Sequence, residues 1–235
     1  MAEKSNMYAE AKTWSPFKGC QFDCVYCGPS FQRQAKRQKH LCEDCYAYRP
    51  HWHEDRLAKV PSASIVFVCG NADLAFCPPE LIQRIIERIK EHSKLAPHKT
   101  YFFQSKQPEC FEPFLAEFPE NVILLTTLET NRDKGYENYS KAPPPTQRYR
   151  QFLRLKYPRK VVTIEPVMDF DLEKFSDWII KLRPEYAWVG MNSRPESVEL
   201  PEPSMEKLAE FMDRLVRAGI EVRGKQLRGL EVPSP

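Results

Sequence analysis

The sequence predicts an α/β protein, a partial parallel β/α barrel of about six strand–helix units that follows an N-terminal cysteine-rich loop. Two observations lead to this fold class. Short apolar runs rich in β-branched residues alternate with segments whose apolar residues recur at helical spacing. Polar residues follow each apolar run, where a parallel barrel builds its active site. We expect a single domain over residues 1–235, with the cysteine-rich loop at 14–53 and the strand–helix array at 64–228.

The strand–helix array begins with an apolar run over 64–70, which predicts a strand. The segment 80–91 follows, and its leucine and isoleucines fall on one face of a helix. The same pattern predicts further strands at 100–104, 122–127, 161–165, 186–190 and 221–224, and helices at 110–118, 146–156, 172–182 and 204–218. Alternating strands and helices are typical of a parallel sheet with right-handed crossovers.

Polar residues gather at the predicted carboxyl ends of the strands. They are Asn71 and Asp73, Ser105 and Lys106, Thr127 and Glu129, Glu165 and Asp169, Asn192 and Ser193, and Lys225 and Gln226. Glu165 ends a strongly apolar strand, where a carboxylate is costly unless it is paired or faces a ligand. A hydrogen bond from a ribose hydroxyl would satisfy the Glu165 carboxylate. Thr127 and Glu129 are similar candidates, which we expect to be more exposed to solvent.

Composition and charge exclude some classes of protein. Lys and Arg total 35 against 32 Asp and Glu, so the net charge of +3 gives no strong field over the whole molecule, and any basic patch must be local. No apolar run approaches the roughly 18 residues of a membrane span. The segment 1–10 lacks the apolar core of a signal peptide. We therefore expect a cytoplasmic protein with no membrane contact, whose eight cysteines are reduced.

Three of these cysteines lie close together in the segment WSPFKGCQFDCVYC. They are Cys20, Cys24 and Cys27, with the aromatic Tyr26 directly before the last. Three thiolates are one too few for a closed metal site. A four-iron cluster on three thiolates keeps an open position at one iron, which is what a metal needs to bind a substrate.

The pattern Cys-x-x-x-Cys-x-aromatic-Cys resembles the signature of the radical S-adenosylmethionine (SAM) superfamily. The resemblance implies a 4Fe–4S cluster whose open iron binds the amino and carboxylate groups of SAM. It also implies a 5′-deoxyadenosyl radical formed with one electron, and hence an electron donor such as a flavodoxin or ferredoxin. The superfamily usually carries a Gly-Gly-Glu segment after its second strand. That place is held here by Gly70, Asn71, Ala72 and Asp73, of which only the first Gly is kept.

The resemblance assigns the binding of SAM to Gly70 and Asn71, and the other candidates for cofactor binding follow from their place at the strand ends. These other candidates are Asp73, Thr127, Glu129 and Glu165.

Four further segments are similar to an uncharacterised phage-protein-like family of radical-type barrels. They are Trp14 to Cys20, Cys45 to Ala47, Glu165-Pro166 and Trp188 to Gly190. In that family a Gly-Cys is followed shortly by Cys-x-x-Cys-Tyr-Ala, which would make Cys20, Cys42 and Cys45 the cluster ligands. We favour Cys20, Cys24 and Cys27, because their contiguous loop needs no long insertion and Tyr26 fits the aromatic position.

Zinc offers a different interpretation of the cysteines. The pairs Cys24/Cys27 and Cys42/Cys45 are spaced like a structural four-cysteine site, which would indicate a zinc-stabilised nucleic-acid-binding module without catalysis. Alternatively, Cys42 and Cys45 bind a second metal, zinc or iron–sulfur, and three nearby histidines could complete that site. These are His40, His51 and His53.

A local basic run, RQAKRQKH over Arg33 to His40, lies beside the proposed cluster loop. Phe31, Tyr46, Tyr48 and Trp52 flank it. Cations interleaved with aromatic rings suit a stacked base and its phosphates. The sequence thus suggests a nucleotide or nucleic-acid substrate. Cys69 and Cys110 are expected in the core, and Cys77 has no assigned role.

Overall fold

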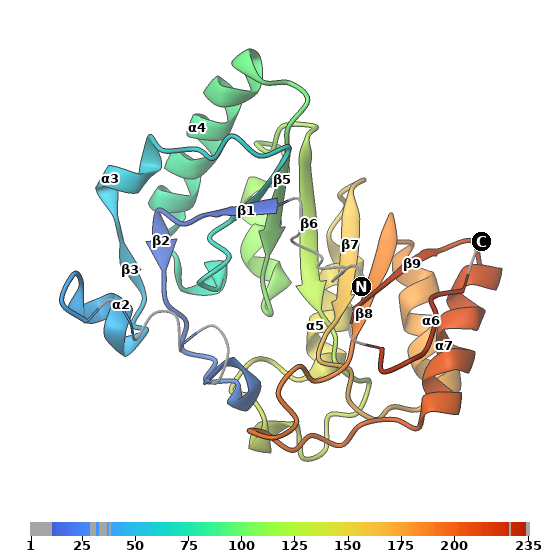
Figure 1. The fold of residues 1–235 in the computed structure, drawn as a ribbon. Coiled ribbons are helices and arrows are strands. Elements are labelled where there is room, and N and C mark those ends of the chain that lie inside the picture. The colour runs from blue at the N-terminus through green and yellow to red at the C-terminus, as the bar shows by residue number, and fades with distance from the viewer. Residues whose placement is uncertain (1–10, 29–31, 33–36, 38, 226, 234–235) are drawn as a thin grey trace.

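The computed structural model describes residues 11–28, 32, 37, 39–225 and 227–233. Its centre is a parallel seven-stranded sheet with the strand order β1-β4-β5-β6-β7-β8-β9, curled into a half-barrel (Figure 1). The strands are β1 (Ala11–Trp14), β4 (Ile65–Val68), β5 (Thr100–Gln104), β6 (Val122–Thr127), β7 (Lys160–Ile164), β8 (Tyr186–Gly190) and β9 (Glu221–Lys225). Because all pairs are parallel, every carboxyl end lies at the same edge of the sheet.

Four α-helices connect the strands and pack against one face of the sheet (Figure 1). They are α4 (Pro79–Leu95), α5 (Pro145–Arg154), α6 (Leu172–Leu182) and α7 (Met205–Arg217). Short 3₁₀ segments lie between them: η4 (Leu74–Phe76), η5 (Pro108–Phe114) and η6 (Tyr136–Asn138). The cysteine-rich region contributes β2 (Phe17–Lys18), η1 (Val25–Cys27), α2 (Glu43–Ala47), β3 (His51–Trp52) and α3 (Glu54–Leu57), and β2 pairs with β3 antiparallel.

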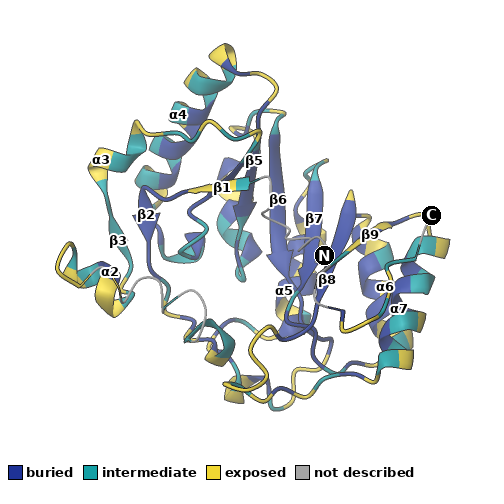
Figure 2. Cartoon of the chain, in the orientation of Figure 1, coloured by how far each residue is buried: buried dark blue, intermediate teal, exposed yellow. Residues whose placement is uncertain are grey.

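The strands β6, β7 and β8 are buried along their whole length, so both faces of the sheet are covered there (Figure 2). On β4, Val66 and Val68 belong to the core beneath the helices, whereas Phe67 belongs to a second cluster on the concave face. This alternation follows from the period of two along a strand, and burial on both faces is typical of parallel sheets. Complete burial of Ile85 on α4 contributes roughly 1.5–3 kcal/mol relative to leaving it exposed.

The structure confirms the predicted α/β partial barrel and its strand–helix order. Two details differ. β1 adds a strand that the sequence did not indicate, because Lys12 and Thr13 are exposed and give no apolar run. The segment predicted as a helix at 110–118 is the 3₁₀ helix η5, which contains Pro113. A proline has no N–H for an α-helical hydrogen bond, which accounts for the difference.

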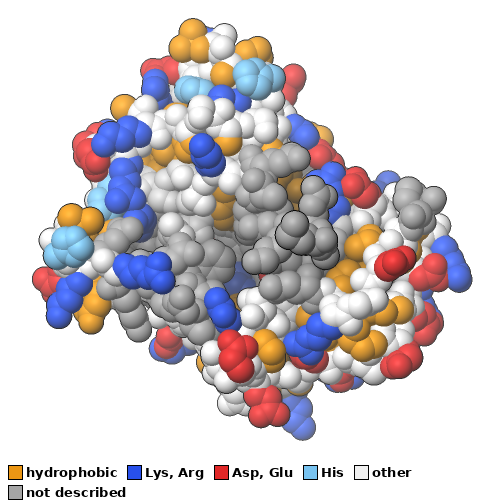
Figure 3. Space-filling model, in the orientation of Figure 1, with side chains coloured by type: hydrophobic (Ala, Val, Ile, Leu, Met, Phe, Trp, Pro, Cys, Tyr) orange, Lys and Arg blue, Asp and Glu red, His pale blue; other side chains and the backbone are white. Residues whose placement is uncertain are grey.

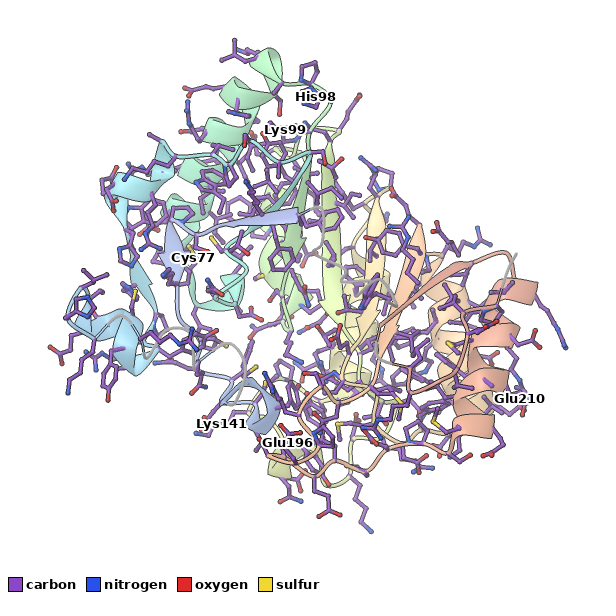
Figure 4. The ribbon with its side chains drawn as sticks, viewed as in Figure 1. Cys77, His98, Lys99, Lys141, Glu196 and Glu210 are labelled. Atoms are coloured by element: carbon purple, nitrogen blue, oxygen red, sulfur yellow. The ribbon has the colours of Figure 1, made fainter. Side chains whose placement is uncertain are left out.

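The remaining cysteines behave as core residues. Cys69 and Cys77 are buried in the main core, and Cys77 is marked in Figure 4. Cys110 is partly buried against the same core. Among the described residues, no helix has both the length and the apolar character that a membrane crossing requires.

Candidate active site at the carboxyl edge of the sheet

The loop that carries Cys20, Cys24 and Cys27 follows β2 and ends in η1. It is held by the segment after β6. Val25 N donates to Tyr139 O at 3.0 Å, and Lys141 N donates to Phe22 O at 2.7 Å. Figure 4 shows Lys141 beside this loop. The cysteine loop and the segment after β6 are thus joined although they lie more than a hundred residues apart in sequence.

The three thiols gather in one small apolar cluster with Phe22, Tyr26 and Phe76, separate from the main core. Cys24 is 4% exposed, and its Sγ lies 3.1 Å from Ser140 Oγ. A hydrogen bond with the Cys27 thiol lowers the pKa of Cys24. Burial raises the pKa of Cys20, and the charge of Asp73 adds to that effect. Three thiols surrounded by aromatic side chains suit an iron–sulfur cluster that must be kept from water.

Gly19 fixes where the cysteine loop enters the site. Its φ of +91° is left-handed, and a Cβ at this position would lie 2.1 Å from Arg49 O. Gly19 N donates to Asn71 O at 3.0 Å, and Cys20 N donates to Tyr48 O at 3.3 Å. The loop therefore passes between the turn after β4 and the segment before β3, with no room for a side chain.

The turn after β4 places Gly70, Asn71 and Asp73 beside that entry point. Gly70 is required for packing, because an added Cβ would lie 2.0 Å from the Phe67 ring. Asp73 accepts hydrogen bonds from Ser105 Oγ (2.6 Å) and from the backbone N of Lys106 (2.8 Å). Burial raises the pKa of Asp73 even though these bonds oppose the rise. Asp73 thus ties the turn after β4 to the end of β5.

Glu129 is the centre of a buried charge network. It forms ion pairs with Lys106 and, at 2.8 Å, with Arg148, and it accepts a hydrogen bond from Tyr26 Oη at 2.5 Å. Burial alone would raise the pKa of Glu129, but the Arg148 and Lys106 charges outweigh it and lower the pKa to about 2. Through Tyr26 this network links the cysteine loop to the barrel.

The sequence predicted that Glu129 and Thr127 are more exposed than Glu165, and the structure shows the reverse. Glu129 is 0% and Thr127 3% exposed, whereas Glu165 is only partly buried. The charges of Lys106 and Arg148 compensate the burial of Glu129, and these partners could not be inferred from the local sequence.

A layer of polar side chains on the concave face forms the floor of the site. Gln104 Nε2 donates to Thr127 Oγ1 at 2.7 Å, and the Thr163 hydroxyl donates to the same oxygen at 2.8 Å. Glu165 Oε2 accepts from Trp188 Nε1 at 2.9 Å. These residues lie one step beyond the apolar residues of the concave face, because alternate residues of a strand share a face.

Other predicted strand-end residues have structural contacts. Asp169 pairs with Arg132 and Lys207, and Asn192 Nδ2 donates to Val198 O at 2.6 Å. The side chains of Lys225 and Gln226 lie outside the described residues.

Sequence reasoning missed Arg148, Gln104 and Thr163. Arg148 is 0% exposed, and its Nη1 donates to Thr127 O at 2.5 Å. One signal was available. Arg148 precedes the buried Phe152 by four residues, which puts a charge on the apolar face of α5.

The second cysteine pair lies in a different environment from the first. Cys42 and Cys45 are grouped with His51 and His53, whereas the predicted His40 is exposed and lies outside that group. Of the basic run, Arg33 and Lys36 lie outside the described residues, as does Phe31. Lys39 Nζ lies 5.2 Å from the centre of the Tyr46 ring.

Comparisons with known proteins show which solved structures have a similar fold. No protein family model matches the sequence, and no curated protein matches it. Solved structures with a similar fold include a radical SAM methyltransferase from Sphaerobacter thermophilus, with a TM-score of 0.62 and 15% identity over 88% of this chain. A spore photoproduct lyase mutant has a TM-score of 0.61 and 13% sequence identity over 95% of this chain. Streptococcus suis SuiB bound to its precursor peptide SuiA has a TM-score of 0.59 and 11% sequence identity over 92% of this chain.

The chain thus has the fold of radical SAM enzymes, in agreement with the resemblance of its cysteine loop. It spans 63% of the methyltransferase, 79% of the lyase and 48% of SuiB. At these identities the likeness concerns the fold, and the closer resemblance to the phage-protein-like family stays a prediction.

Proposed function

We propose that this chain is a radical SAM enzyme that binds a 4Fe–4S cluster through Cys20, Cys24 and Cys27. The observation that carries the proposal is the grouping of these three thiols in one apolar cluster of side chains at the carboxyl edge of a half-barrel with the fold of radical SAM enzymes. This grouping supports the contiguous set over the alternative of Cys20 with Cys42 and Cys45, since the latter pair contacts histidines.

When bound, the cluster and SAM supply the one-electron cleavage of a sulfonium bond that yields a 5′-deoxyadenosyl radical. The chain positions these groups. The backbone at Gly70 and Asn71 lies beside the cysteine loop and is suited to receive the amino group of SAM. On the polar floor, Glu165 is suited to accept a hydrogen bond from a ribose hydroxyl. The Thr127 hydroxyl already accepts from Gln104 and Thr163, so it is suited to donate one. Asp73 and Glu129 already have partners within the chain, so we assign them to holding the turn after β4 and Tyr26 in place.

The aromatic residues beside the thiols also serve to exclude water. The centres of the Phe22 and Phe76 rings lie 4.7 Å apart, and both rings pack in the same apolar cluster as the thiols. A dry site protects a reactive radical from side reactions. An electron donor such as a flavodoxin or ferredoxin is required by this chemistry, and we propose it as a transient partner.

The test is anaerobic purification followed by addition of reductant and SAM. We expect a brown, iron-containing protein that forms 5′-deoxyadenosine. Cys27→Ala should lose both iron and product, because a cluster iron that lacks its thiolate is lost. Cys77→Ala is the matched control, since it removes a thiol of the main core and should keep both. A protein without iron after anaerobic reconstitution would overturn the proposal. Full activity in Cys27→Ala together with loss in Cys42→Ala would transfer the cluster to the other cysteines.

We also propose a nucleotide or nucleic-acid substrate beside the cluster loop. Arg37 and Lys39 are exposed, and Lys39 lies over the Tyr46 ring. Figure 3 shows Lys and Arg side chains on the side of the molecule formed by α2, α3 and α4. A spore photoproduct lyase with a similar fold binds a dinucleoside spore photoproduct, which supports this class, whereas SuiB binds a peptide. Nothing in these comparisons supports a zinc-stabilised binding module without catalysis.

Binding of a short single-stranded oligonucleotide at two salt concentrations tests the substrate class. A phosphate contact should weaken steeply as salt rises, and Lys36→Ala with Arg37→Ala should flatten that dependence. Lys181→Ala, a change at an exposed cation on α6, is the control and should leave the dependence unchanged. Absence of binding at low salt would favour a small metabolite or a protein as substrate.

A further inference from the structure

A second group of metal ligands lies outside the cluster loop. The ligand atoms of Cys42, Cys45, His51 and His53 all lie within 4.8 Å of one another. Cys45 Sγ is 3.3 Å from His51 Nε2 and 3.2 Å from His53 Nε2, and Cys42 Sγ is 3.5 Å from His51 Nε2. The two Nε2 atoms are 2.8 Å apart.

Two short elements bring these side chains together. Cys42 is the N-cap of α2, and Cys45 lies one turn further along, with its backbone N donating to Cys42 Sγ at 3.4 Å. His51 and His53 lie two residues apart along β3 and its continuation, so both point to the same side. A pair of cysteines on a helical turn thus faces a pair of histidines on a strand.

We propose that Cys42, Cys45, His51 and His53 bind a single zinc ion. Zinc takes two thiolates at about 2.3 Å and two imidazoles at about 2.0 Å in a tetrahedron, which implies ligand-to-ligand edges of about 3.3–3.8 Å. Three nitrogen-to-sulfur separations of 3.2–3.5 Å lie at or just below these edges, the two nitrogens are closer at 2.8 Å, and all four ligand atoms lie within 4.8 Å of one another. A two-iron cluster with the same ligands would place the thiolates on one iron and the imidazoles on the other. Here each histidine nitrogen lies against a thiol, so the four atoms surround one point.

The groups around these ligands support the assignment. His51 Nδ1 lies 2.7 Å from Arg49 O, and a donor at Nδ1 leaves Nε2 with the lone pair that faces the thiols. Lys18 Nζ lies 3.7 Å from Cys45 Sγ and brings positive charge to a site with two thiolates. Four protein ligands complete the coordination of zinc, so the site is structural and has no open position for a substrate.

The position of the site indicates what the ion stabilises. His51 is paired with Lys18 across β2 and β3, and Gly19 and Cys20 follow Lys18 directly. His53 N donates to Pro16 O at 2.6 Å, and Cys20 N donates to Tyr48 O. The zinc ligands therefore fix the segment against which the cluster loop begins, and the ion is a positioning element for Cys20.

Metal analysis of anaerobically purified protein separates the two sites. We expect one zinc per chain in the wild type, in addition to iron. The triple variant with Cys20, Cys24 and Cys27 changed to Ala should lose iron and keep zinc. Cys42→Ser and His53→Asn should each lose zinc. His98→Asn, a change at an exposed histidine on the far side of α4 (Figure 4), should keep both metals.

Cobalt gives a readout that does not depend on a zinc-ligand variant folding. The triple cysteine variant, exchanged with Co²⁺, should develop the intense visible bands and the thiolate charge-transfer absorption of a tetrahedral site with sulfur ligands. A weak spectrum typical of octahedral cobalt, or wild-type protein with far less than one zinc, would overturn the proposal. Loss of iron in Cys42→Ser with zinc absent throughout would overturn it as well and would assign the pair to the iron cluster. A lack of iron in zinc-containing wild type would contradict the proposed enzyme and leave the zinc site standing.

Discussion

Arg148 is the residue on which the buried charge of Glu129 most depends. Its side chain is 0% exposed, pairs with Glu129 at 2.8 Å and lies over the Tyr136 ring at 4.8 Å. Removing one partner of a buried ion pair leaves an uncompensated charge, which costs more than the pair contributes. We expect Arg148→Met to lower the free energy of unfolding by about 3–5 kcal/mol. Urea unfolding at neutral pH measures it.

The control for this change is a surface pair of the same chemistry. Arg217 on α7 pairs with Asp213 at 2.6 Å, with an arginine side chain that is 77% exposed. Arg217→Met should cost less than about 1 kcal/mol, because water screens an exposed pair. Equal losses in the two variants would contradict the structural role given to Arg148.

The stability that the buried charge of Glu129 contributes should depend on pH in a defined direction. The pKa of Glu129 is lowered from 4.5 to about 2, so its contribution to stability is complete above pH 4.5 and is lost as the pH falls toward 2. In Arg148→Met the pKa of Glu129 should rise, because only the Lys106 charge remains to oppose burial. Between pH 4.5 and 2 the variant should therefore lose less stability than the wild type, and its loss should end at a higher pH. Identical pH profiles would argue against this coupling.

At the scale of single elements, the sequence predicted the helices and strands whose burial follows directly from the pattern of apolar residues within the element. The strand β6 at 122–127 and the helix α6 at 172–182 have the predicted bounds, because period and burial coincide there. β1 was missed because an edge strand of four residues with two exposed positions carries no apolar pattern.

The ligand role of the cysteine loop is a prediction from its spacing, and the shape of the loop could not be predicted. The spacing of Cys20, Cys24 and Cys27 indicated the chemistry, whereas their orientation depends on Tyr139, Ser140 and Lys141, which lie far along the chain. The sequence offered His40, His51 and His53 as candidates for a metal site with Cys42 and Cys45. Only the pairing of β2 with β3 selects His51 and His53 and leaves His40 exposed.

At the scale of the whole molecule, the apolar residues form separate clusters. The main core joins the sheet to its helices, and a smaller cluster fills the concave face. The cluster cysteines belong to neither. They pack in a third group with Phe22 and Ala142, which contacts the rest through a few side chains. Stability of the half-barrel should therefore be largely independent of the metal-binding loop.

Hydrogen exchange on the triple variant of Cys20, Cys24 and Cys27 to Ala tests this independence. We expect β5, β6 and β7 to keep their slow exchange, because their hydrogen bonds and core contacts do not involve the loop. The amides of Val25 and Lys141 should exchange faster, since they donate across the loop to Tyr139 O and Phe22 O. Ile85→Ala is the opposite case. It removes a fully buried side chain of the main core, so it should cost about 2–5 kcal/mol and speed exchange in all strands. Loss of protection throughout the sheet in the triple variant would show that the loop and the half-barrel fold as one cooperative unit.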